Sequence, residues 1–209
     1  MTGGLSLDDI LDLRAYERVR DDYRQRVMAL KRRRRVPLGP IATVVFECVD
    51  TVRFQVQEMA RAERIATDEG IQHELDVYNR LLPAPGELSA TLFLELITEA
   101  DLRHWLPRLV GIERAVALEI GAPDAGRLDV ARSEPEASHA ESLTRETVTP
   151  AVHYLRFPVD EAAVRRFAAE PVALAVHHPE YEARTPLDDA VRTELFADLE
   201  GRTEPLPLG

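Results

Sequence analysis

The chain has 209 residues, of which 45% are hydrophobic and 30% charged, and its formal net charge at pH 7 is −11. This composition is that of an ordinary globular protein, and it excludes a disordered or fibrous chain. The length favours a single compact domain over residues 1–209.

The first part of the chain is predicted to be helical. Ser6 and the acidic residues behind it start a short helix to about residue 13, because a capping side chain and first-turn carboxylates stabilise a helix N-terminus. Residues 14–35 carry apolar side chains at steps of three and four, which predicts a long helix with one buried stripe. The stripe consists of Tyr16, Val19, Tyr23, Val27 and Leu30. Pro37 ends this helix, and residues 37–40 are expected to form a turn.

The next segments combine a strand with two helices. Residues 43–49 are short and rich in β-branched side chains, which predicts a strand. Residues 52–65 contain both an alternating and a helical apolar pattern, and a helix is favoured. A further helix is expected at 71–82, where it stops before Pro83.

Beyond residue 86 the pattern indicates strands separated by helices. Strands are expected at 88–97, 112–120, 152–157 and 172–177, and helices at 98–109, 160–169 and 187–199. Residues 121–150 lack apolar periodicity and predict an irregular loop or excursion. The expected fold class is α+β: N-terminal helices, then a mainly antiparallel sheet of about five strands with helices packed on it. The strands are not the uniformly apolar runs of buried parallel sheets.

The sequence also allows a prediction of the cellular compartment and of whether the chain spans a membrane. No stretch approaches the roughly 18 consecutive apolar residues of a membrane span, and the N-terminus shows no basic leader followed by an apolar run. The single cysteine, Cys48, excludes an intramolecular disulfide. Because such a chain suits a reducing compartment, we expect a cytoplasmic protein without a membrane partner.

Three acidic residues interrupt apolar patterns and are candidate site residues. Glu47 lies in the predicted strand at 43–49, whereas Glu63 and Glu74 fall on the apolar faces of two predicted helices. Buried carboxylates need an arginine partner, a proton or a metal ion. One interpretation is pairing with the arginines nearby in sequence, namely Arg53, Arg61 and Arg64. The other is an oxygen-rich metal or acid–base site formed by Glu47, Glu63, Glu74 and Tyr78.

The segment HHPEY follows the strand at 172–177. It contributes four further candidates, His177, His178, Glu180 and Tyr181. Strand ends often present ligands, but adjacent histidines on a strand point to opposite faces. One interpretation adds His178 to a metal site for iron, zinc or manganese. The other is a capped strand end followed by a proline turn.

Positive charge is concentrated at the N-terminus. Residues 1–35 contain ten basic and six acidic side chains, whereas the remainder contains sixteen and thirty-one. The basic segment is therefore expected to dock on the acidic body of its own chain or on a second copy, which would make a homodimer. The basic run at 31–35 also permits nucleic-acid binding, but the overall acidity and the lack of a recognisable nucleic-acid-binding motif disfavour it.

Several segments resemble a bacterial family known only as a domain of unknown function. They are KRRRRVPLGP, FECVDTVRFQVQEMARAERI, IQHELDVYNRLLP, LSATLFLEL, VHYLRFPV and HHPEY. Members are often encoded beside rubrerythrin and an iron–sulfur oxidoreductase, so the resemblance implies a role in redox or peroxide defence and nearby redox proteins as partners. We expect an accessory protein of a redox or iron-linked stress system that binds a partner or a metal. A metal-dependent enzyme with a carboxylate and histidine centre and a nucleic-acid-binding protein are the alternatives.

Overall fold

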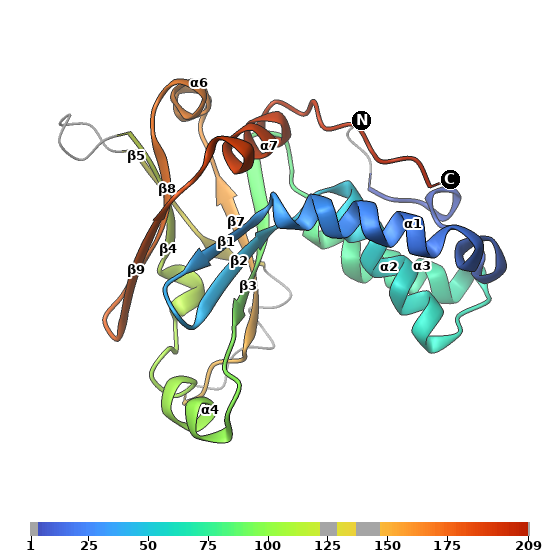
Figure 1. Ribbon diagram of the computed structural model, residues 1–209, viewed down its shortest axis with the longest axis horizontal. Coiled ribbons are helices and arrows are strands. Elements are labelled where there is room, and N and C mark those ends of the chain that lie inside the picture. Colours follow the sequence, from blue (N-terminus) through green and yellow to red (C-terminus); the bar gives the residue numbers. More distant parts are fainter. Residues whose placement is uncertain (1–3, 122–128, 137–146, 209) are drawn as a thin grey trace.

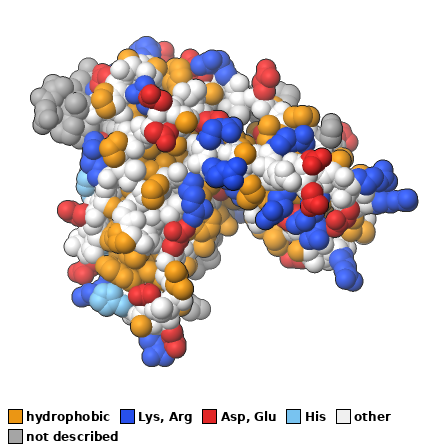
Figure 2. All heavy atoms as spheres, viewed as in Figure 1, with side chains coloured by type: hydrophobic (Ala, Val, Ile, Leu, Met, Phe, Trp, Pro, Cys, Tyr) orange, Lys and Arg blue, Asp and Glu red, His pale blue; other side chains and the backbone are white. Residues whose placement is uncertain are grey.

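The computed structural model describes residues 4–121, 129–136 and 147–208. Helices α1, α2 and α3 project from one side of a body that contains two β-sheets (Figure 1). The three helices, here called the helical arm, stand at an angle to the body, and the surface of the molecule is concave between the helical arm and the body (Figure 2).

The helical arm is formed by α1 (Leu13–Arg32), α2 (Val49–Glu63) and α3 (Asp68–Tyr78). The predicted stripe of α1 is confirmed, since its buried residues are Tyr16, Tyr23, Val27 and Leu30. The Asp12 side chain caps α1 by accepting a hydrogen bond from the Ala15 amide at 2.8 Å. Between α2 and α3 a small apolar cluster forms around Val56 and Leu75, both of which are fully buried. A 3-10 turn, η1 (Leu7–Asp9), precedes α1, and another, η2 (Asn79–Leu81), follows α3.

The body consists of two antiparallel sheets. The five-stranded sheet has the order β1 (Arg35–Leu38), β2 (Ala42–Phe46), β3 (Glu87–Leu94), β7 (Val152–Pro158) and β6 (Glu134–Pro135). The four-stranded sheet has the order β5 (Asp129–Arg132), β4 (Val116–Ile120), β8 (Val172–His178) and β9 (Tyr181–Pro186). The remaining helices of the described residues are α4 (Glu99–Trp105), α6 (Glu161–Ala169) and α7 (Asp189–Leu199), with the 3-10 turn η3 (Ile112–Arg114) before β4.

The main core combines apolar side chains from both sheets. Alternate residues of the longer strands point into it, including Leu92 and Phe157 from the five-stranded sheet and Leu118 and Leu174 from the other. The helix α6 adds Phe167, which is fully buried. The five-stranded sheet therefore buries one face in this core and turns its other face toward the helical arm.

The predicted α+β class is confirmed, but the strands form two sheets where we expected one of about five strands. The predicted helix for residues 52–65 is confirmed as α2. The expected turn at 37–40 was placed too early, because residues 35–38 form β1. Pro37 is tolerated there because β1 is the outermost strand of its sheet. The expected strand at 112–120 begins only at Val116.

Three further strands, β5, β6 and β9, were missed. Within the expected loop at 121–150, the described residues include β5 and β6, which pair with β4 and β7. Residues 122–128 and 137–146 of that prediction lie outside the described residues. The strand β9 was not predicted either, although its side chains alternate between the core and the exterior. Every helix in the described parts of the chain is too short or too polar to cross a membrane.

Candidate functional site

Glu47 lies where the five-stranded sheet meets the helical arm. It follows the last residue of β2 and precedes the first turn of α2. Its amide donates a hydrogen bond to the carbonyl of Ser89 at 2.7 Å, which extends the pairing with β3 by one residue. The side chain is 9% exposed, so the predicted burial of this carboxylate is confirmed.

Two hydroxyl groups, and no arginine among the described residues, hold the Glu47 carboxylate. The Thr91 hydroxyl donates to Oε1 at 2.6 Å, and the Thr51 hydroxyl donates to Oε2. Thr51 is itself held in place because its hydroxyl accepts a hydrogen bond from the Cys48 amide at 2.9 Å. A carboxylate oxygen can accept two hydrogen bonds, so the described residues leave each oxygen of Glu47 one further acceptor position.

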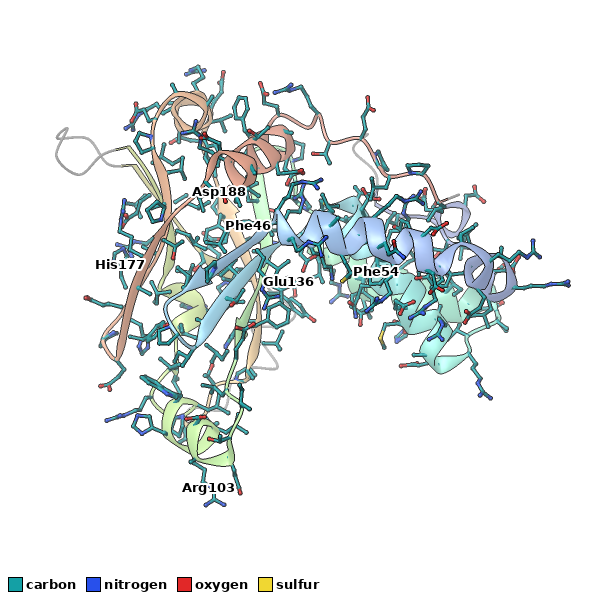
Figure 3. All side chains as sticks on the ribbon, viewed as in Figure 1. Phe46, Phe54, Arg103, Glu136, His177 and Asp188 are labelled. Atoms are coloured by element: carbon teal, nitrogen blue, oxygen red, sulfur yellow. The ribbon has the colours of Figure 1, made fainter. Side chains whose placement is uncertain are left out.

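The sheet aligns further polar side chains with Glu47. Thr91 pairs with Tyr154 in the register of β3 and β7, and the Glu136 amide donates to the Tyr154 carbonyl at 3.0 Å. Because neighbouring strands lie about 4.8 Å apart, these residues form one row across the sheet. Glu136 is buried, and Figure 3 places it between the sheet and the helical arm.

Tyr154 connects this row to the helix α3. Burial raises the pKa of the Tyr154 phenol, and the nearby Tyr78 and the charge of Glu47 raise it further. Glu74 lies one helical turn before Tyr78, so both side chains occupy the same face of α3. Glu74 is buried as predicted, and its carboxylate makes no hydrogen bond or ion pair with the described residues. Glu47, Tyr78 and Tyr154, with Glu74 one helical turn from Tyr78, are the candidate site, here called the junction site.

Glu63 does not point inward, contrary to the prediction. It is the last residue of α2, and its side chain is exposed. Arg64 then adopts a left-handed conformation with φ 56°, which turns the chain away from the helix axis. The buried side of α2 ends at Ala60, so the helical pattern continues for one turn beyond the residues that pack against it.

His178 lies on the four-stranded sheet and is not part of the junction site. Its Nε2 atom lies 3.1 Å from the Val110 carbonyl oxygen, and its Nδ1 atom accepts the Glu180 amide at 3.2 Å. Both ring nitrogens are therefore engaged, which leaves no lone pair for a metal. The interpretation of HHPEY as a turn is supported, since Pro179 and Glu180 connect β8 to β9.

The other candidates of this segment also have structural partners. The Tyr181 hydroxyl donates to the carbonyl of Leu38, and Glu180 forms an ion pair with Arg108 at 3.5 Å. His177 points to the opposite face of the sheet, where its Nε2 atom lies 3.0 Å from Glu119. Within the described ranges, no three His, Cys, Asp or Glu side chains are grouped closely enough to hold a metal ion.

The basic segment docks on the acidic body of its own chain. Arg34 is fully buried and binds both oxygens of Asp198, at 2.5 and 3.0 Å. Arg33 pairs with Glu194 at 2.6 Å, and Arg35 pairs with Glu95. Of the two docking surfaces considered from the charge distribution, the structure thus shows the intramolecular one.

The sequence patterns did not identify Thr51, Thr91 or Tyr154 as site residues. The alternation in VHYLRFPV was a usable signal, because it places Tyr154 on the face opposite to His153 and Leu155. Thr91 could be connected to Glu47 only once the register of β2 and β3 was known.

The sequence profile described as "Protein of unknown function (DUF3501)" matches residues 4–199. The chain belongs to the DUF3501 family. A crystal structure at 1.90 Å resolution of a novel protein of unknown function from Burkholderia pseudomallei is similar to it, with 36% sequence identity and a TM-score of 0.83. That alignment covers 95% of this chain and 100% of the other. No curated protein matches the chain. Neither DUF3501 nor the similar structure has an assigned activity, so the redox role implied by the resemblance stays a prediction.

Proposed function

We propose that this DUF3501 protein is an accessory component of a redox or iron-linked stress system that binds a divalent metal ion at the junction site. The observation that supports this proposal is the environment of Glu47. A carboxylate that serves the fold is normally paired when it is buried, because the loss of hydration must be compensated. Among the described residues, the hydrogen bonds to the Glu47 carboxylate come from two neutral hydroxyl groups, one to each oxygen.

The donor set favours one class of metal ion. The junction site offers carboxylate and phenol oxygens, which suit manganese or ferrous iron better than zinc, for which sulfur and nitrogen ligands are commonest. Since the described residues do not group three acidic or imidazole side chains, water must complete the coordination shell. Hard cations held by one or two carboxylates commonly retain several waters.

The observed ion pairs bear on the other hypotheses. Arg33, Arg34 and Arg35 belong to the run at 31–35 that suggested nucleic-acid binding, and all three pair with carboxylates of the same chain. The same pairs remove the charge argument for a homodimer, which stays a prediction. Sedimentation at micromolar concentration tests it, and a species of only 23.5 kDa would contradict it.

Metal analysis of protein purified without an affinity tag tests the proposal. We expect wild-type protein to contain manganese or iron in near-stoichiometric amount after anaerobic incubation with Mn²⁺ or Fe²⁺ and removal of excess ion. Glu47→Gln removes the ligand charge while keeping the shape of the side chain, so this variant should lose the metal.

Glu63→Gln is the matched control, because Glu63 is exposed and lies outside the junction site. It should retain as much metal as the wild type. Folded wild-type protein that remains free of metal, or a Glu47→Gln variant that keeps it, would exclude the proposed site.

A further inference from the structure

The C-terminal segment 204–208 lies in an extended conformation against α1 and α2, on the side of the helical arm shown in Figure 1. Its side chains alternate, since Leu206 and Leu208 are half-buried while Pro205 and Pro207 are exposed. Both leucines pack against an apolar cluster that contains Tyr23 and Phe54.

A buried ion pair binds the main chain of Leu206 from both sides. The Asp50 carboxylate accepts the Leu206 amide, at 3.1 Å for Oδ1 and 3.0 Å for Oδ2. The Arg53 guanidinium donates to the Leu206 carbonyl at 2.5 Å and to Asp50 at 2.6 Å. Asp50 and Arg53 are 2% and 7% exposed, so these hydrogen bonds are shielded from water.

Two further contacts complete the binding surface. Arg26 donates to the carbonyl of Pro207 at 2.9 Å, and the Arg53 guanidinium lies over the ring of Tyr23 at 5.5 Å. Basic side chains are gathered along α1 (Figure 2). We call the surface formed by Tyr23, Arg26, Asp50, Arg53 and Phe54 the tail groove.

The contacts of the tail groove do not require one particular peptide sequence. Its hydrogen bonds to the tail bind three main-chain groups, and its apolar wall contacts two aliphatic side chains at alternate positions. All groove residues lie inside the part of the chain that matches DUF3501, whereas residues 204–208 lie beyond residue 199, where that match ends. The groove residues therefore lie inside the matched range, and the present occupant lies outside it.

We propose that the tail groove is a docking site for an extended, proline-containing segment of a partner protein with leucine-like side chains at alternate positions. The chain's own residues 204–208 are then a tethered competitor. The tether is short, because the Thr203 hydroxyl still donates to Asp198 at 2.5 Å and holds the chain next to α7. The described residues that would leave the groove are 204–208. A partner segment must displace a competitor whose effective concentration is in the millimolar range.

A binding experiment on the full chain tests this proposal. The probe is a fluorescein-labelled peptide with the sequence of residues 202–208, RTEPLPL. In the variant Leu206→Asp/Leu208→Asp the tail should leave the apolar wall, and this variant should bind the peptide at least about 100-fold more tightly than the wild type. Adding Arg26→Ala to the released variant should weaken binding, and the exposed substitution Glu204→Ala should leave the wild-type behaviour unchanged.

Four results would overturn the proposal. A folded released variant that does not bind the peptide shows that the groove accepts no separate segment, and a released variant that fails to fold shows that the tail is a fixed part of the core. Wild-type protein that binds the peptide equally well shows that the tail does not compete. A wild-type dimer that the peptide converts to monomers identifies the tail of a second copy as the occupant.

Hydrogen exchange on the wild type gives an independent measurement. If the tail opens while the fold remains intact, the Leu206 amide should exchange at least about 100-fold faster than the amides of the central strands β3 and β4. Equal protection of Leu206 and these strands would contradict a displaceable tail.

Discussion

Glu47 and Asp50 are two buried carboxylates only three residues apart, yet their surroundings differ. Asp50 pairs with Arg53 and accepts the Leu206 amide, so its charge is balanced and it fixes the tail. Glu47 receives hydrogen bonds from two threonine hydroxyls and no positive partner among the described residues. The difference separates a carboxylate that stabilises the fold from one that remains available to a ligand.

Substitution of each carboxylate in turn should give the largest difference in stability and so tests the comparison most directly. Asp50→Asn leaves the buried Arg53 without a counter-charge, so we expect the free energy of unfolding to fall by about 3 kcal/mol. Glu47→Gln leaves no charge unpaired and should change it by less than about 1 kcal/mol in metal-free protein. Urea unfolding at pH 7 measures both. Equal losses would show that Glu47 has a structural role like that of Asp50.

Cys48 stands between the two carboxylates in the sequence, and the pH dependence of stability tests how well this segment is shielded from water. Burial raises the pKa of the Cys48 thiol to about 11, although the Arg34 guanidinium acts in the opposite direction. The folded protein thus retains a proton that the unfolded chain releases above pH 9, and the associated stability is present below pH 9 and lost as pH rises through 11. Between these values the wild type should lose on the order of 2 kcal/mol more than Cys48→Ser.

Urea unfolding of the two proteins at pH 8, 9, 10 and 11 gives this difference directly. Because the tyrosines titrate in both proteins, their contribution cancels. Parallel pH profiles would show that the thiol is hydrated, and the segment between Glu47 and Asp50 would then be less tightly closed than the structure indicates.

The smallest effect is expected at Glu119, whose carboxylate has two partners. His177 lies 3.0 Å from one oxygen, and Arg184 donates to the other at 2.8 Å. Since His177 is partly exposed and Arg184 remains, His177→Ala should lower the free energy of unfolding by no more than about 0.5 kcal/mol. A loss above about 1 kcal/mol would mean that an arginine alone does not suffice for a buried carboxylate in this fold, which would weaken the contrast drawn for Glu47.

Local patterns predicted what depends on a single element. The burial of Tyr16, Tyr23 and Glu74 followed from helical spacing, and that of Glu47 followed from its apolar surroundings. The register that joins Thr91 to Tyr154 depends on residues more than sixty positions apart, and no local pattern contains it. Glu63 was misplaced because helical spacing does not show where the neighbouring packing ends.

The shortest strands were not predicted, for a related reason. The strands β1, β5 and β6 have two to four residues, and β1 contains a proline. Such segments have little intrinsic preference, so their conformation is decided by the strands beside them. The antiparallel class was nevertheless predictable, because the strands are not uniformly apolar runs and β7 shows the alternating burial of a strand with one face in the core.

The outermost strand β1 has a consequence for the behaviour of the protein at high concentration. Pro37 offers no amide for pairing, its carbonyl accepts the Thr185 hydroxyl at 2.5 Å, and the next carbonyl, that of Leu38, accepts the Tyr181 hydroxyl. Exposed strand edges recruit other chains and start aggregates. Side chains of the second sheet already occupy this edge, so the second sheet protects the β1 edge of the first from edge-to-edge association.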